Sequence, residues 1–116
     1  NINFKDLGSY NSTKSVNYPD YAHKVCLKVS KNKLNIGILV CGSGMGMAMT
    51  ANKHKKIRAA LCYSVKNAKL SRLHNDANVI TLGSRLTNKK TAFNCLNVFL
   101  KTKFEGGRHK KRVNKI

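Results

Sequence analysis

A cysteine followed by three alternating glycines is the feature of this sequence best suited to chemistry. Cys41 ends an apolar run, and Gly42, Gly44 and Gly46 lead into a stretch with helical character. A strand, a tight loop and a helix in this order turn several backbone N–H groups and the positive end of a helix toward one point. Such a point stabilises a thiolate and a developing oxyanion. We therefore predict that Cys41 is a nucleophile or base beside a group of backbone N–H donors that stabilises negative charge.

A purely structural explanation of Cys41 stands beside this one, because a cysteine at the end of a strand more often packs in a core than reacts. The glycines favour reactivity. Their spacing, Gly-x-Gly-x-Gly followed by Met47, matches neither the dinucleotide motif Gly-x-Gly-x-x-Gly nor the phosphate loop that ends in Gly-Lys-Ser/Thr. We therefore predict no nucleotide cofactor.

The charge of the chain has two explanations. The 116 residues include 23 Lys and Arg against four Asp and Glu, a formal net charge of +19. This charge indicates either a polyanionic partner, such as nucleic acid or an acidic membrane surface, or a compositional bias toward Lys and Asn. The lysines are spread along the chain without interleaved aromatic residues, unlike those of single-strand binders. We favour the bias and expect neither a membrane nor nucleic acid as a partner.

The cysteines indicate neither a metal site nor a disulfide framework. Cys26, Cys41, Cys62 and Cys95 form no C-x-x-C pair and no His lies at metal-ligand spacing. Reduced thiols fit an intracellular compartment, and no apolar run approaches the roughly 20 residues that span a bilayer. We expect a cytoplasmic protein with no metal and no organic cofactor.

The elements that must position Cys41 alternate between strand and helix, which predicts an α/β fold with a parallel sheet and helices on both faces. The length indicates one domain. Residues 36–41 are apolar throughout, as expected of a strand covered on both faces. Three strands are few for this architecture, so we expect a further strand–helix unit before Asn1. Hydrophobic periodicity and turn residues predict helices over 19–30, 45–53 and 65–73, strands over 36–41, 57–62 and 79–82, a polar elbow over 74–78, and a helix capped by Thr87 or Asn88 that Gly106 and Gly107 end.

Several blocks of residues occur in the order and spacing of a known family. They are Tyr18-Pro19-Asp20-Tyr21-Ala22, Val40-Cys41-Gly42-Ser43-Gly44-Met45-Gly46, Asn52-Lys53, Ile57-Arg58-Ala59-Ala60-Leu61-Cys62, His74-Asn75-Asp76-Ala77-Asn78-Val79, Leu82-Gly83-Ser84-Arg85 and Phe104-Glu105-Gly106-Gly107-Arg108-His109. Together they resemble the type B ribose-5-phosphate isomerases, whose relatives include the galactose-6-phosphate and allose-6-phosphate isomerases. The resemblance extends from about Lys5 to Ile116.

The resemblance implies a Rossmann-like three-layer α/β/α sandwich, with residues 1–116 forming a single sugar-phosphate isomerase domain. It also implies a homodimer or dimer of dimers with active sites shared between subunits, and no cofactor. The implied reaction interconverts ribose 5-phosphate and ribulose 5-phosphate in the non-oxidative pentose phosphate pathway. The family begins with a strand that ends in an Asp-His pair, and nothing in this sequence corresponds to it. We therefore expect that the first strand–helix unit is missing from this chain.

The resemblance also assigns roles to individual residues. Cys41 matches the base that moves a proton between C2 and C1, Ser43 keeps the hydroxyl of a position where Thr is commoner, and His74 matches the residue linked to ring opening. The N–H groups around Gly42, Gly44 and Gly46 would stabilise the enediolate. The remaining matches are a sugar contact at Tyr18, a polar neighbour of His74 at Asn75, and phosphate-binding cations at Arg85, Arg108 and Arg112.

Alternative functions remain open at this point. The same family includes hexose-6-phosphate isomerases, and the sequence does not distinguish the length of the sugar. A non-catalytic protein of this fold could instead bind nucleic acid through its charge or serve for dimerisation. Taken singly, His74 would be a helix cap or a surface residue, and Arg108 and Arg112 would form a solvated basic face, since they lie one helical turn apart.

Overall fold

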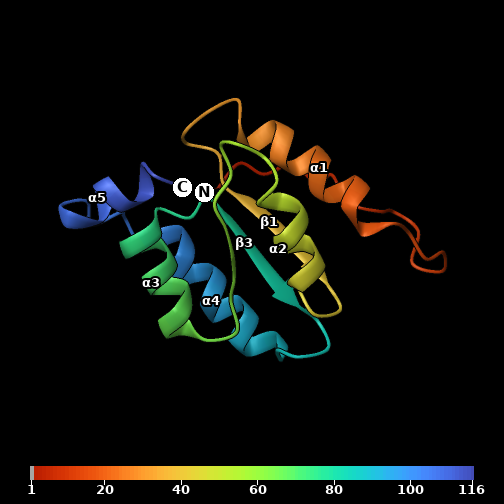
Figure 1. Ribbon diagram of the computed structural model, residues 1–116. Coiled ribbons are helices and arrows are strands. Elements are labelled where there is room, and N and C mark those ends of the chain that lie inside the picture. The colour runs from red at the N-terminus through yellow and green to blue at the C-terminus, as the bar shows by residue number, and fades with distance from the viewer. Residues whose placement is uncertain (1) are drawn as a thin grey trace.

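A three-stranded parallel sheet lies between two layers of helices in the computed structural model, which describes residues 2–116 (Figure 1). The strands are β1 (Gly37–Cys41), β2 (Ala59–Leu61) and β3 (Val79–Gly83), in the spatial order β1-β3-β2. The helices are α1 (Tyr18–Val29), α2 (Met45–Ala51), α3 (Val65–Asn75), α4 (Lys89–Lys101) and α5 (Arg108–Val113). The predicted α/β/α sandwich with a parallel sheet is confirmed.

The central strand β3 is buried along its whole length because helices cover both of its faces. Side chains alternate between the two faces of a strand. Val79 packs in one apolar cluster with residues of α1, α2 and β1, whereas Ile80 and Leu82 pack in a second cluster with residues of α3 and α4. Two cores on either side of one strand therefore hold the sandwich together.

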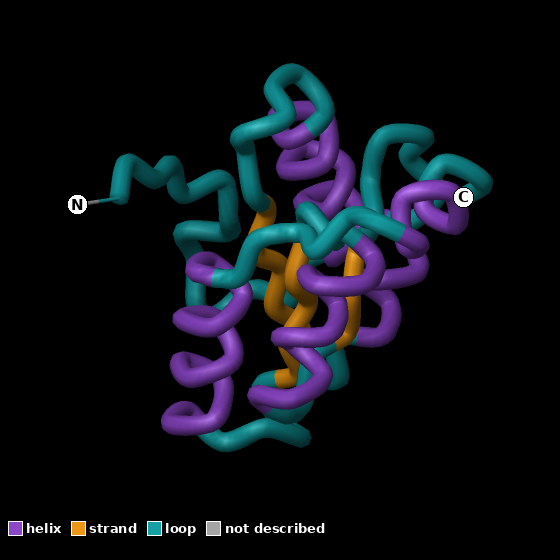
Figure 2. Tube along the Cα trace, turned by 90° about the vertical axis from the view of Figure 1, so that its left-hand side faces the viewer, coloured by secondary structure: helices purple, strands orange, loops and turns teal. Residues whose placement is uncertain are grey.

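The outer strand β1 departs from the prediction for residues 36–41, which expected cover on both faces. Leu39 is buried in the α1–α2 core, but Ile38 and Val40 are 44% and 52% exposed. Within residues 2–116 no helix lies across that face of β1 (Figure 2), and residues 2–9 line the groove beside it. The prediction was wrong here because the apolar pattern shows what a strand can bury, not what is present to cover it.

The element boundaries follow local hydrogen bonds. The Asn88 side chain caps α4 by accepting from the Thr91 N–H at 2.8 Å, and Ser64 and Asn67 form a capping box at the start of α3. Helix α4 ends at Lys101, so the glycines at 106 and 107 precede α5 and do not terminate α4 as predicted. Strand β2 has three residues rather than the predicted six, 57–62.

The predicted polar elbow 74–78 is partly helical, because α3 continues through Asn75 and ends at Asp76 in the left-handed conformation (φ 48°). Two arginines hold this turn. Arg58 Nε donates to the Asp76 carbonyl at 2.8 Å, and Arg72 Nη1 donates to the Ala77 carbonyl. Asn78 accepts from the Arg58 backbone N–H at 2.8 Å. The elbow is polar because its side chains satisfy the backbone where β2 and β3 begin.

None of the helices in residues 2–116 combines the length and the apolar run needed to cross a bilayer.

The core contains one polar group whose replacement should stabilise the fold. Thr81 is fully buried in β3, and its hydroxyl has no hydrogen-bond partner among residues 2–116. We expect Thr81→Val, which keeps the shape of the side chain, to raise the free energy of unfolding by about 1 kcal/mol, because it removes a buried unpaired hydroxyl. Urea denaturation checks this, with Thr13→Val on the exposed N-terminal segment as the control. A loss of stability at position 81 would mean that the hydroxyl has a partner.

Candidate active site

Cys41 lies at the carboxyl end of β1, where its thiol is half-buried and hydrogen-bonded. The backbone N–H of Gly44 donates to Cys41 Sγ at 3.1 Å, and the Met45 N–H donates to Ser43 Oγ at 3.2 Å. Both groups belong to the turn between β1 and α2. The loop therefore presents a thiol and a hydroxyl together, with backbone donors directed at both.

Two glycines permit this turn. Gly44 has a φ of 77°, in the left-handed region that other residues rarely adopt. Gly83 ends β3 directly beside the loop, and a Cβ placed on it would lie 2.5 Å from the Ser43 carbonyl oxygen. Because that obstacle is backbone, only glycine at position 83 lets the strand end lie against the loop that carries Cys41.

Tyr18 and Arg85 join Cys41 at this edge of the sheet. A Cβ on Gly46 would overlap the phenol of Tyr18, so the tyrosine lies directly against the glycine loop. The Arg85 side chain lies over Gly42, with its guanidinium 3.3 Å from the position that a Cβ there would take, and the Arg85 N–H donates to the Gly42 carbonyl at 3.0 Å. A cation and a phenol thus flank the glycine loop that follows Cys41.

The other predicted site residues lie at the opposite edge of the sheet. Helix α3 ends beside the start of β3, so His74 and Asn75 lie near the amino ends of the strands, where α5 also packs (Figure 1). The β1–β3 pairing runs from Gly37 to Cys41. Four residue steps along a strand span about 13 Å. One chain therefore does not bring Cys41 together with His74, Asn75, Arg108 and Arg112.

His74 belongs to a small cluster that the sequence analysis missed in part. Its ring stacks on that of His109, with centroids 4.2 Å apart and planes 16° from parallel. The Glu105 carboxylate lies 3.9 Å from His74 Nε2 and 4.0 Å from His109 Nε2. Burial, and then the charges of His74 and Arg108, lower the pKa of His109. The i,i+4 spacing of Glu105 and His109 in the Phe104–His109 block was the available signal.

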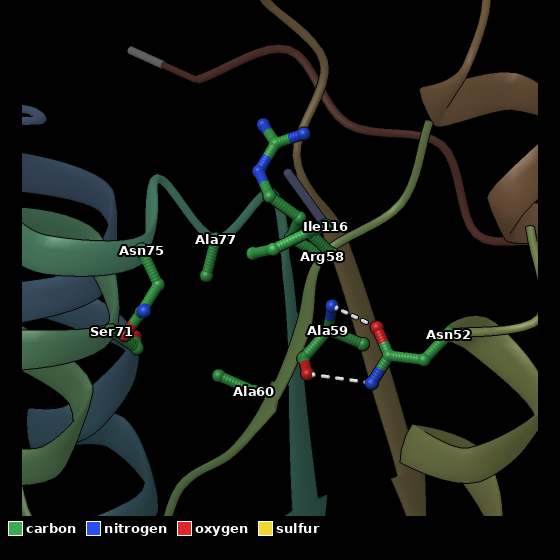
Figure 3. Close-up of a pocket in the computed structure, with 8 residues that line it drawn as sticks. All are labelled: Asn52, Arg58, Ala59, Ala60, Ser71, Asn75, Ala77 and Ile116. Atoms are coloured by element: carbon green, nitrogen blue, oxygen red, sulfur yellow. Dashed lines mark hydrogen bonds between the residues drawn. The ribbon is translucent and has the colours of Figure 1, made fainter. Parts of the chain in front are cut away.

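A pocket of about 290 Å³ opens at this second edge, between α3 and β2 (Figure 3). Asn75 and Arg58 line it, and the Asn52 amide forms hydrogen bonds with both the N–H and the carbonyl of Ala59 at 2.8 and 3.0 Å. No cysteine lines this pocket, and the hydroxyl of Ser71, which does, donates to the Ala68 carbonyl at 2.8 Å. A larger groove, about 1160 Å³, has Cys41 on its wall together with β1, α1 and residues 2–9. The groove beside Cys41 is therefore a better candidate for the reactive centre than the smaller pocket.

The other three cysteines are buried and serve the core. Burial raises the pKa of the Cys26 and Cys62 thiols to about 11 and also raises the pKa of Cys95. A protonated, buried thiol is a poor nucleophile. The packing explanation therefore applies to these three cysteines, and Cys41 remains the candidate for a reactive thiol.

Iodoacetamide at pH 8 should alkylate Cys41 before the three buried cysteines, because Cys41 is the one with solvent access in the folded protein. Mass spectrometry of the intact protein and of its peptides should show one early adduct at position 41. Cys41→Ser should remove that adduct without exposing the others. Early modification of Cys26, Cys62 or Cys95 would contradict this assignment.

Comparison with known proteins gives consistent matches. A family model described as Ribose/Galactose Isomerase matches residues 1–116. A putative sugar phosphate isomerase of Rickettsia bellii is 48% identical over 111 residues, which are 96% of this chain and 76% of that protein.

Two solved structures are similar over the same region. Ribose 5-phosphate isomerase B from Anaplasma phagocytophilum is 52% identical with a TM-score of 0.89, covering 95% of this chain and 74% of that one. The enzyme of the same name from Mycoplasma genitalium, solved with bound ribulose-5-phosphate, is 45% identical with a TM-score of 0.91 and covers 95% and 73%.

Proposed function

The chain belongs to the ribose/galactose isomerase family, and we propose that it interconverts ribose 5-phosphate and ribulose 5-phosphate with Cys41 as the base. The observation that carries this proposal is the half-buried thiol at the end of β1, with the Gly44 N–H directed at its sulfur at 3.1 Å. The similarity to a structure that holds ribulose-5-phosphate supports the choice of substrate. The reaction would belong to the non-oxidative pentose phosphate pathway.

In the proposed mechanism the Cys41 thiolate removes the proton from C2 of the open-chain aldose. The electron pair moves into the C1–C2 bond, and the charge collects on the C1 oxygen as an enediolate. Backbone N–H groups of the glycine loop and the Ser43 hydroxyl stabilise that oxygen. Cys41 then returns the proton to C1 while the hydroxyl proton on the C2 oxygen passes to the C1 oxygen, which produces the ketose. The reaction involves no net redox change.

Ring opening and phosphate binding are proposed to use a second chain. His74, Asn75, Arg108 and Arg112 lie at the opposite end of the strands from Cys41 in the same chain, and the strands between the two ends are about 13 Å long, which a sugar phosphate does not bridge with both ends engaged. In a homodimer with a two-fold axis, the edge that carries Cys41 in one chain can face the edge that carries His74 in the other. Arg85, Arg108 and Arg112 then offer guanidinium groups suited to a phosphate dianion.

Cys41→Ala should lower kcat for ribose 5-phosphate by about 10²–10⁴-fold, because general base catalysis contributes that much. The assay uses the full natural protein and follows ribulose 5-phosphate. Cys26→Ala, which removes a buried thiol of the α1–α2 core, is the matched control and should retain activity wherever it folds. Activity in the Cys41→Ala variant within tenfold of the wild type would exclude Cys41 as the base. Galactose 6-phosphate and allose 6-phosphate in the same assay test the hexose alternative.

Mixing two inactive variants tests the shared site. Cys41→Ala and His74→Gln, co-expressed with different tags, should restore activity, because one site of each mixed dimer then contains both native residues. Random pairing predicts about a quarter of the wild-type activity. Each variant alone should stay inactive. If the mixture is also inactive while mixed dimers form, Cys41 and His74 do not act in one shared site.

A further inference from the structure

Three metal-ligating side chains gather where α3 ends and α5 begins, away from the Cys41 loop. His74 Nε2, the Glu105 carboxylate and His109 Nε2 provide ligand atoms that all lie within 4.8 Å of one another. Glu105 is the last residue before the two glycines that precede α5, and its N–H donates to the Leu73 carbonyl at 3.1 Å. That hydrogen bond holds the carboxylate beside His74.

The buried histidine in this cluster has a ring nitrogen without a hydrogen-bond partner. His109 is 5% exposed, and its Nε2 forms no hydrogen bond with any of residues 2–116. A buried polar atom without a hydrogen-bond partner destabilises the folded state, so a bound water or ion that interacts with the atom is the usual explanation. The unpartnered nitrogen belongs to the same group as the Glu105 oxygen and His74 Nε2, so a cation among the three would complete it.

We propose that His74, Glu105 and His109 bind Zn²⁺ or a cation of the same class. Two imidazoles and one carboxylate form a donor set that zinc accepts, with a fourth position left for water. Bonds of about 2.0–2.2 Å require the ligand atoms to approach one another by roughly 1 Å, and the His74 ring to turn out of its stack on His109, because an imidazole nitrogen binds a metal in the plane of its ring. The side chains of His74 and Glu105 are 37% and 55% exposed and can rotate toward the buried His109. Magnesium and calcium do not fit because they prefer oxygen ligands.

The surrounding charges limit the affinity. Arg108 and Arg112 lie on the same helix as His109 and act on it electrostatically, so they also repel a dication. Glu105 provides the only carboxylate of the cluster. Its charge therefore decides whether zinc binds, and Glu105 is the residue to change first.

Zinc binding would also inhibit the enzyme. A cation on His74 Nε2 occupies the atom that ring opening is proposed to need. This consequence rests on the proposed function, whereas binding itself does not. Zinc would then act as an inhibitor at the His74 edge and leave the Cys41 loop unchanged.

Calorimetric titration with Zn²⁺ tests the site. All proteins carry Cys41→Ser, so that the accessible thiol does not take the metal. We expect one equivalent of zinc to bind. Glu105→Gln should weaken zinc binding at least about 10-fold, because loss of even a residue that only hydrogen-bonds to a metal ligand lowers metal affinity by that much. Because Glu105 is exposed, this change should not disturb folding. His109→Gln, where it folds, should abolish binding.

Two controls separate this site from other sources of affinity. Asp20→Asn removes one exposed carboxylate elsewhere. The double change His23→Gln and His54→Gln removes the other close histidine pair, whose ring nitrogens lie 2.7 Å apart. Both controls should bind zinc within about twofold of the parent, because they leave all three ligands in place. No binding, or equal binding in the parent and Glu105→Gln, would overturn the proposal.

An activity assay with Cys41 intact separates the two proposals. Zinc should inhibit the wild type, and Glu105→Gln should need at least about 10-fold more zinc for the same inhibition. Zinc binding without inhibition of an active isomerase would overturn the inhibition but not the site. An inactive protein that still binds one zinc through Glu105 would overturn the proposed function alone.

Discussion

The parallel pairing of β1 with β3 is the constraint on which the candidate site depends. The pairing aligns Cys41 with Gly83, so both strands end at the same level. Just after the strands end, the Ser84 N–H donates to the Cys41 carbonyl at 2.9 Å, and the Arg85 N–H donates to the Gly42 carbonyl at 3.0 Å. The chain after β3 is thereby held against the chain after β1. This contact places the Arg85 guanidinium beside Gly42, the residue after Cys41, although more than forty residues separate them in sequence.

The same parallel topology explains why one chain holds only half of the proposed machinery. In a strand–helix–strand unit the helix returns the chain to the amino end of the sheet. Residues in the loop after a strand, such as Cys41, lie at one edge, and residues at the end of a returning helix, such as His74, lie at the other. Symmetric association of two chains is a physically simple way to bring such edges together. Ile38 and Val40 also leave an exposed apolar surface on β1, which association with a second chain could bury.

Burial sorts titratable groups of the same type into different roles. Three cysteines lie in the two cores, where desolvation favours the neutral thiol, and one lies at a strand end with a backbone donor. The histidines are divided in a similar way. His109 is buried and His74 partly exposed, and one carboxylate lies near both. The structure therefore assigns different chemistry to residues that a composition count treats as equal.

Local patterns in the sequence determined the element types, the parallel sheet and the loop around Cys41. Periodicity, capping residues and glycines act over a few residues, so α1, α2 and the cap at Asn88 were predicted within a residue or two. Only the tertiary structure decided that α3 extends through His74, that β1 is covered on one face, and that Glu105 and His109 join His74. The grouping of Glu105 and His109 with His74 depends on contacts between segments about thirty residues apart. No local pattern encodes such a contact, because its energy arises only when the sheet has brought the segments together.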